Sequence, residues 1–288
     1  MPEPNIADLQ RLSMALNEDH HRRMTEAYLA QDPGARARAL AMDDASYRHL
    51  LAPLGRLGGR CLELGSAAGR QLPLLLEVAD AVWGVDPHAP SVQAGRAAGY
   101  DIVQGFAEDL PFPDETFDLV CSRHVMEHTY DYGRALAEIR RVLKPGGYVA
   151  AVTPHVFPDP EPAHTTQLTI NQWVRAYEAA GFAIVRATLA TFNVPECHIL
   201  ARKPLPGEVI VPHPDLPLSP VPPPTAPAAP APGPHRPGAV ARRSRPWAGR
   251  RTGCSAGRRR LGRQQAMARG PNRSRRARRQ GERRRRRE

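Results

Sequence analysis

Apolar and polar residues alternate over the first 205 positions with two periods, which together predict short strands separated by helices. The apolar runs at 61–64 and 81–85 have the length of buried strands, and Glu63 is the one charge in the first of them. Within 72–79, apolar residues recur at i, i+3, i+4 and i+7, which is the spacing of one helix face. Strands that alternate with helices predict a parallel sheet joined by right-handed crossovers.

The same patterns place the remaining elements. Helices are expected through most of 6–54, with a break at Asp32-Pro33-Gly34, because proline and glycine interrupt a helical period. Thr169 and Gln172 have the spacing of a capping box and mark the start of the last helix. The other expected elements are a helix at 89–98, strands at 101–103 and 117–121, a helix through 135–142 that is stopped by the turn 144–147, and strands at 148–152, 183–190 and 197–201.

A glycine turn after the first strand is the candidate ligand site. Gly65 and Gly69 enclose three small residues, and small side chains let a ligand approach the backbone N–H groups closely. Asp86 ends the second strand 21 residues after Gly65, where an acidic side chain holds both hydroxyls of a ribose. Glu63 is expected to face the same crevice. The alternative for Asp86 is a turn residue that only ends a strand.

This spacing also suits a nicotinamide cofactor, whose fingerprint contains three glycines. Here the third glycine is missing, and Ser66, Ala67 and Ala68 separate the two that are present. Three further motifs follow in the chain. They are an acidic and aromatic stretch at 108–120, Glu127-His128, and Arg141-Val142-Leu143-Lys144-Pro145-Gly146-Gly147.

With these four motifs in this order, residues 45–205 resemble the class I S-adenosylmethionine-dependent methyltransferases of the small-molecule, type 11-like family. The resemblance implies an α/β fold, a Rossmann-like doubly wound sheet of seven strands that ends in a C-terminal antiparallel hairpin. It also implies N-terminal helices beside the sheet. The implied cofactor is S-adenosyl-L-methionine.

The resemblance also assigns residues to the cofactor. Two positions depart from the family pattern: Ala67 stands where a glycine is usual, and Phe106 stands where an aspartate usually contacts the adenine amino group. Recognition of adenine would then fall to Glu108 or to a backbone carbonyl. The resemblance places Glu63, Gly65, Ser66, Ala67 and Gly69 around the methionine half, Asp86 and Pro87 at the ribose, Ala107 and Glu108 beside the adenine, and Arg123 and His124 at the sulfonium and the acceptor.

Histidines are the candidates for acid–base chemistry, because methyl transfer to a hydroxyl also requires removal of a proton. His128, beside Glu127, and His124 follow a strand at the carboxyl edge of the sheet, where ligands bind. The alternative for both is a capping or packing role. They also complete an H-x-x-E-H pattern, but a zinc protease would need a third ligand and other flanking motifs. We therefore expect no metal site. The possibility of a divalent ion that assists the methyl acceptor stays open.

Charge divides the chain into two parts. The whole chain carries +11; from Pro206 to the end, 21 arginines stand against four acidic residues, which gives +17 and leaves −6 for the remainder. We expect an N-terminal helical lid or packing segment (1–44), a methyltransferase domain (45–205), a disordered Pro/Ala-rich linker (206–241) and a disordered arginine-rich tail (242–288). The tail is either an arm for RNA or another polyanion, or the product of a shifted reading frame, since it contains no lysine.

The expected activity is methyl transfer from S-adenosylmethionine to a small-molecule acceptor, at oxygen. A polar start and the lack of an apolar run of about 18 residues argue against a signal peptide or a membrane span. Four scattered cysteines are typical of a reducing compartment, so we expect a cytoplasmic enzyme. Two alternatives stay open. One is a protein that modifies or binds nucleic acid through its arginine-rich tail, and the other is a domain that has lost catalysis.

Overall fold

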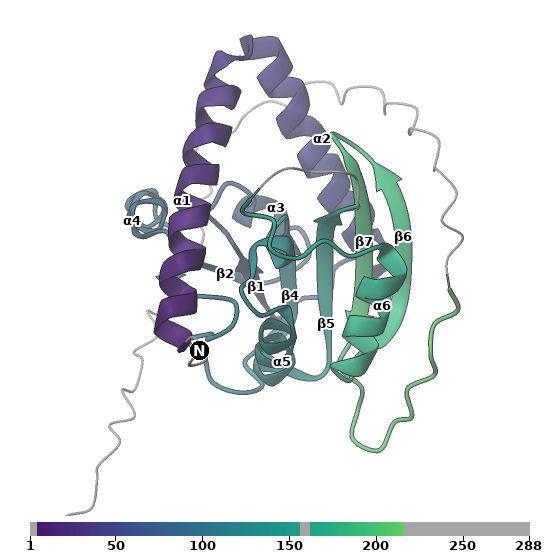
Figure 1. Cartoon of the computed structure of the whole chain (residues 1–288). Helices are drawn as coiled ribbons and strands as arrows, with labels where there is room; N and C mark the ends of the chain where they lie inside the picture. The colour runs from purple at the N-terminus through teal and green to yellow at the C-terminus, as the bar shows by residue number, and fades with distance from the viewer. Residues whose placement is uncertain (1–4, 156–161, 216–288) are drawn as a thin grey trace, which may run out of the picture. The chain divides into compact units, whose positions relative to one another are not determined.

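The computed structural model describes residues 5–155 and 162–215 (Figure 1). The expected arginine-rich tail and the part of the expected linker from residue 216 on lie outside the described residues. Residues 206–215 continue from the last strand, and Asp215 there pairs with Arg175 at 2.6 Å. No helix in the described ranges is long and apolar enough to cross a membrane.

Seven strands form one sheet in the described part of the chain. They are β1 (Arg60–Leu64), β2 (Ala81–Asp86), β3 (Ile102–Gln104), β4 (Phe117–Arg123), β5 (Leu143–Pro154), β6 (Ala183–Thr191) and β7 (Pro195–Arg202). The order is β3-β2-β1-β4-β5-β7-β6. The first five strands in this order are parallel, and β7 pairs antiparallel with both β5 and β6. The expected Rossmann-like doubly wound sheet with a C-terminal antiparallel hairpin is confirmed.

Helices cover both faces of this sheet (Figure 1). They are α1 (Ile6–Ala30), α2 (Pro33–Leu51), α3 (Leu72–Leu75), α4 (Ala89–Ala97), α5 (Tyr132–Val142) and α6 (Ile170–Ala179), with short 3-10 turns at η1 (Ala52–Leu54) and η2 (Met126–His128). Successive side chains of a strand point to opposite faces. Cys61 of β1 therefore packs in a core with Tyr47 of α2, while Leu62 packs in a second core with Ile139 of α5 and Trp173 of α6.

Two sequence signals for helix starts are confirmed. The Asp32 side chain accepts a hydrogen bond from the Ala35 N–H at 2.9 Å and caps α2, so the predicted break between the N-terminal helices is real. Thr169 and Gln172 form the expected capping box at the start of α6. Both signals depend on neighbours three residues apart, which is why the sequence shows them directly.

Two element boundaries differ from the prediction. The helix expected over 72–79 ends at Leu75, and Leu76 is 38% exposed instead of buried. The strand expected from residue 148 already begins at Leu143, directly after α5. Leu143 pairs with Phe117 of β4, and Gly146, at φ +80°, donates its N–H to the Lys203 carbonyl. The turn at 144–147 thus becomes part of the sheet through partners on both sides. These partners are distant in the sequence, so the local pattern does not show them.

Candidate functional site

A cavity of about 260 Å³ lies at the carboxyl end of the parallel strands. The turn after β1, the end of β2, the segment 105–108 and the turn after β4 form its walls, and α1 contributes a further wall through residues that include Ser13, Asn17 and His20. Parallel strands place their carboxyl ends at one edge of a sheet, so loops that are distant in sequence meet there. The α1 residues were not among the expected site residues, although their spacing of three to four positions forms one stripe of the helix.

The cavity brings together most of the expected cofactor residues and both candidate catalytic histidines. Gly65, Ala67, Asp86, Pro87, Ala107, Glu108, His124 and His128 line it. Glu63, Ser66, Gly69 and Arg123 are not among its lining residues. The Ser66 hydroxyl instead packs above Gly84 of the neighbouring strand, where a Cβ would come within 2.3 Å of it.

Asp86 joins the glycine turn to the end of β2. Its carboxylate accepts hydrogen bonds from the N–H groups of Ala67 and His88, both at 2.8 Å. The side chain therefore anchors the turn, and Asp86 is also one of the residues that line the cavity. Ala67 has φ +46°, a left-handed conformation in which glycine has no steric penalty.

Both the backbone conformation and the lack of space for a side chain require glycine at position 65. It has φ +62°, and a Cβ at this position would lie 2.3 Å from Cγ2 of Val125, a β-branched side chain with little freedom to move. Gly65→Ala is therefore expected to lower the free energy of unfolding by about 1–3 kcal/mol more than Gly99→Ala does. Gly99 is the matched control, since it has φ +93° and a Cβ there would meet no atom within 4 Å. Urea unfolding measures both, and equal losses would contradict a clash at Val125.

Glu63 lies on the other face of β1 from Leu62 and Leu64, because side chains alternate along a strand. It is buried at 3% exposure, and the Gln71 amide, in the orientation that satisfies its neighbours, donates to it at 3.3 Å. Burial raises the pKa of Glu63 to about 8, although the nearby Arg70 opposes this. Glu63 thus carries its proton at neutral pH and does not contribute to the cavity wall.

This raised pKa predicts a pH-dependent stability. Between about pH 4.5 and pH 8 the folded chain holds the Glu63 proton and the unfolded chain does not, so stability falls as pH rises through this window. The slope for one group is about 1.4 kcal/mol per pH unit. Glu63→Gln stays neutral and should remove this slope. Urea unfolding of both proteins at pH 5, 6, 7 and 8 tests this, and parallel stability curves would show that Glu63 does not titrate in the window.

The cavity has an aromatic side chain at the position where the family resemblance leads one to expect an aspartate. Phe106 lines the cavity and contacts the Tyr130 ring edge-on, with centroids 6.3 Å apart. The neighbouring Glu108 is buried, and its Oε1 accepts the Tyr130 N–H at 2.7 Å. Burial raises the pKa of Glu108 despite this bond. Phe106 therefore presents an aromatic surface to the cavity, while the Glu108 carboxylate is engaged with the backbone at Tyr130.

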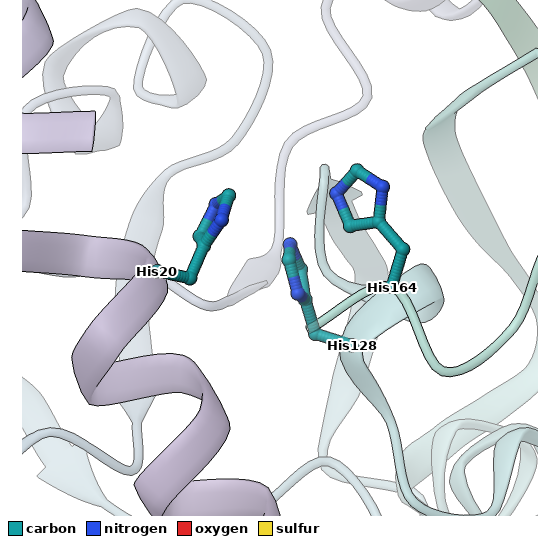
Figure 2. A group of neighbouring side chains, drawn as sticks. All are labelled: His20, His128 and His164. Atoms are coloured by element: carbon teal, nitrogen blue, oxygen red, sulfur yellow. The ribbon is translucent and has the colours of Figure 1, made fainter. Parts of the chain in front are cut away.

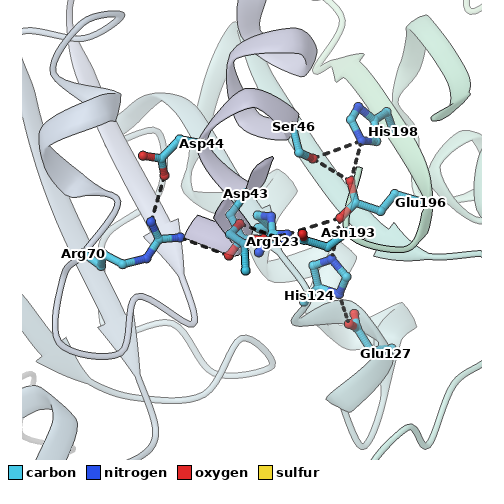
Figure 3. A network of polar contacts seen from close by, with 11 residues as sticks. Asp43, Asp44, Ser46, Arg70, Arg123, His124, Glu127, Asn193, Glu196 and His198 are labelled. Atoms are coloured by element: carbon cyan, nitrogen blue, oxygen red, sulfur yellow. Dashed lines mark hydrogen bonds and ion pairs between the residues drawn. The ribbon is translucent and has the colours of Figure 1, made fainter. Parts of the chain in front are cut away.

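Arg123 belongs to a buried polar network behind the cavity (Figure 3). Its guanidinium donates to Asp43 of α2 at 2.6 Å and to Glu196 of β7 at 3.2 Å. The other Glu196 oxygen accepts from the Ser46 hydroxyl at 2.6 Å and from His198 at 3.0 Å. The Arg123 side chain that was expected beside the sulfonium is thus engaged in holding α2 against β4 and β7.

His124 is held between two carboxylates. Its Nε2 lies 3.0 Å from Glu196 and its Nδ1 lies 3.4 Å from Glu127 (Figure 3). Burial alone would lower the pKa of His124, but hydrogen bonds to Glu127 and Glu196 raise it to about 9. The ring is an imidazolium at neutral pH with both nitrogens engaged. It can supply positive charge to the cavity, but it has no lone pair with which to accept a proton.

His128, four residues later, has the opposite electrostatic setting. Its Nδ1 lies 3.0 Å from the Ala163 carbonyl, and because a carbonyl only accepts hydrogen bonds, Nδ1 carries the proton. Burial lowers the pKa of His128, and the neighbouring His20 and His164 act in the same direction, although Glu127 opposes them. The ring is therefore neutral with a lone pair on Nε2. Of the two candidate histidines, this one can act as a base.

Comparison with known proteins agrees with this geometry. Residues 62–151 match the family described as a methyltransferase domain. A probable S-adenosylmethionine-dependent methyltransferase of Mycolicibacterium smegmatis is 34% identical over 152 residues, which is 48% of this chain and 59% of that protein. A fatty-acid O-methyltransferase of the same organism is 32% identical over 146 residues, 48% of each chain. The chain thus spans about half the length of these curated relatives.

A solved structure supplies the corresponding fold. It is the 1,6-didemethyltoxoflavin-N1-methyltransferase of Burkholderia thailandensis, with 1,6-didemethyltoxoflavin and S-adenosylhomocysteine bound. The two structures align with a TM-score of 0.54 at 20% identity, and the alignment covers 71% of this chain and 93% of that one. The likeness to this structure lies in the fold, a seven-stranded sheet with helices on both faces. Residues 62–151 match the methyltransferase domain family, and together with the curated relatives this match confirms the expected resemblance and its cofactor.

Proposed function

We propose that this protein transfers a methyl group from S-adenosylmethionine to an oxygen atom of a small-molecule acceptor. The observation that carries the proposal is one cavity that is lined both by the Gly65 turn and Asp86 and by His128 and residues of α1. Donor and acceptor could therefore be held in line within one cavity. Alignment of this kind supplies much of the acceleration of a displacement reaction.

The residues present fit the cofactor. Gly65 has no side chain to fill the cavity beside the turn, and the Asp86 carboxylate reaches the cavity from the end of β2. S-adenosylmethionine, when bound, supplies a methyl group on a positively charged sulfur that leaves as a neutral thioether. Asp86 would accept hydrogen bonds from the ribose hydroxyls, and the Phe106 ring would contact the adenine.

At the acceptor end, α1 and the turn after β4 close the cavity. Ser13, Met14 and Asn17 of α1 would cover the acceptor and exclude water. His128 Nε2 would receive the proton of an acceptor hydroxyl, because its Nδ1 is already committed to the Ala163 carbonyl. Transfer to oxygen is also supported by the relative named as a fatty-acid O-methyltransferase.

The proposal is tested by methyl transfer from labelled S-adenosylmethionine. The full chain is incubated with a panel of long-chain fatty acids, phenols and alcohols, and in parallel with total RNA. We expect label in a methyl ester or ether, and the same rate after deletion of residues 216–288. Label that enters only RNA, and is lost on that deletion, would overturn the proposal in favour of a nucleic-acid substrate. Label on nitrogen alone would overturn the choice of oxygen.

A further inference from the structure

Three histidines from separate segments converge beside the cavity, which two of them, His20 and His128, line (Figure 2). His20 comes from α1, His128 from η2 after β4, and His164 from the loop before α6. Their possible ligand atoms lie within 4.8 Å of one another, and their ring centroids are 4.8 to 5.8 Å apart. Imidazole nitrogen is a preferred ligand of divalent transition metals. We propose that this cluster binds one ion of the Zn²⁺ class.

His128 already has the arrangement of a metal ligand. In protein metal sites, the ring nitrogen that does not bind the ion usually donates a hydrogen bond to a carbonyl or a carboxylate. His128 Nδ1 makes this bond to the Ala163 carbonyl at 3.0 Å. The bond fixes the tautomer and places the lone pair on Nε2, which is the ligand atom that the cluster requires.

The loop that carries His164 is tied to the turn that carries His128. The Thr165 hydroxyl donates to the Thr129 carbonyl at 2.6 Å, and the Thr166 N–H donates to the Glu127 carbonyl at 3.1 Å. The bond from His128 to Ala163 lies in the same contact. Two of the three ligands are thus positioned by hydrogen bonds that do not need the ion, so part of the ordering cost of the site is already met.

A buried negative charge lies beside the cluster. Glu127 is 2% exposed, and its Oε1 lies 3.9 Å from His128 Nε2, while His124 approaches the same oxygen at 3.4 Å. Three neutral imidazoles leave the two positive charges of the ion uncompensated. A carboxylate at this distance offsets part of that charge in a site with little water.

The number of ligands indicates a site with an open position. Structural zinc sites have four protein ligands, whereas catalytic sites have three and leave the fourth position for water or substrate. Nitrogens on a tetrahedral Zn²⁺ lie about 3.3 Å apart, so the ion must draw the three rings closer together. Because hydrogen bonds join the segments that carry His128 and His164, most of this movement falls to His20, and the ion would hold α1 over the cavity.

The open position would face the cavity, which both His20 and His128 line. An acceptor oxygen could bind there, and the ion would lower the pKa of its hydroxyl so that the proton passes to solvent water. His128 would not take this proton, because its lone pair would be bound to the ion. This consequence for the acceptor rests on the proposed methyl transfer. The metal site itself does not, because ion binding needs neither S-adenosylmethionine nor acceptor.

The test is direct metal binding to the full chain. Protein treated with EDTA and then dialysed is titrated with Co²⁺, followed by its visible absorption, and Zn²⁺ is added in competition. We expect one equivalent with the strong absorption of tetrahedral Co²⁺. His20→Ala and His164→Ala should each weaken binding by at least about a hundredfold, since loss of a ligand costs at least as much as loss of its supporting bonds. His88→Ala is the matched control, a cavity histidine outside the cluster, and should bind as the unchanged protein does.

A rescue variant separates ligation from folding. His20→Cys keeps a zinc ligand at the position on α1, and it should restore binding and add a sulfur-to-cobalt absorption band that His20→Ala lacks. Circular dichroism melting shows whether each variant is folded. No stoichiometric binding by the folded chain, or binding that neither His20→Ala nor His164→Ala weakens, would overturn the site. Metal binding without methyl transfer would overturn only the proposed function.

Discussion

Asp86→Ala is expected to weaken binding of S-adenosylmethionine by about 10- to 100-fold. The loss of hydrogen bonds to a charged acceptor costs about 1.5–3 kcal/mol, and 1.4 kcal/mol is a factor of ten in Kd. The variant also removes the acceptor of the Ala67 and His88 N–H groups, so the glycine turn loses its anchor to β2. Isothermal titration calorimetry of the full chain with S-adenosylmethionine and with S-adenosylhomocysteine measures the effect.

Asp86→Asn is the control for charge. It keeps the shape of the side chain and one oxygen acceptor, so it should bind more weakly than the unchanged protein and more tightly than Asp86→Ala. An unchanged Kd in a folded Asp86→Ala protein would show that the ribose is held elsewhere. A melting curve of each variant without cofactor separates loss of the anchor from loss of the ligand contact.

Glu196→Ala is expected to lower the free energy of unfolding by about 3–5 kcal/mol, because removal of one member of a buried ion network leaves its partners uncompensated. Glu196 is fully buried and contacts Arg123, His124, Ser46 and His198. Burial alone would raise the pKa of Glu196, but the bonds from His124 and His198 hold it well below its usual range. Urea unfolding at neutral pH measures the loss.

Glu77→Ala is the surface control. Glu77 pairs with Arg48 at 2.8 Å, with both side chains more than half exposed, and exposed pairs of this kind contribute about 0–1 kcal/mol. Glu196→Gln provides a second measurement, because it removes the charge beside His124 and should lower the pKa of His124 from about 9, as seen by NMR titration. If Glu196→Ala cost no more than the surface control, the network would not stabilise the fold.

The two histidines of the H-x-x-E-H pattern show how position decides chemistry. His124 is charged between Glu127 and Glu196, whereas His128 is neutral with Nδ1 committed to the Ala163 carbonyl. Opposite pKa shifts four residues apart separate a fixed positive charge from a group with a lone pair. The sequence favours His128 only because it stands beside Glu127. It does not show the opposite charge states, since neither Glu196 nor Ala163 is near the two histidines along the chain.

Local signals in the sequence determined most of the fold. Strand and helix periods, the helix break at Asp32 and the capping box at Thr169 all depend on neighbours a few residues apart. The structure contains each of them, although α3 is shorter and β5 longer than expected. The glycine turn and the spacing to Asp86 likewise follow from one βαβ unit, so their meeting in one cavity could be predicted. The alternation of β1 also places Glu63 on the face opposite to Leu62 and Leu64, which pack together in one core.

Only the tertiary structure decided the roles that depend on distant partners. Arg123 faces Asp43 and Glu196, which lie 80 and 73 residues away, and so joins an ion network and not the cavity wall. His20 on α1 and His164 in the loop before α6 come close to His128, although both are distant from it in the sequence. The physical reason is that periodicity fixes which face a residue occupies on its own element. What that face meets depends on how the elements pack, and no short-range pattern encodes this.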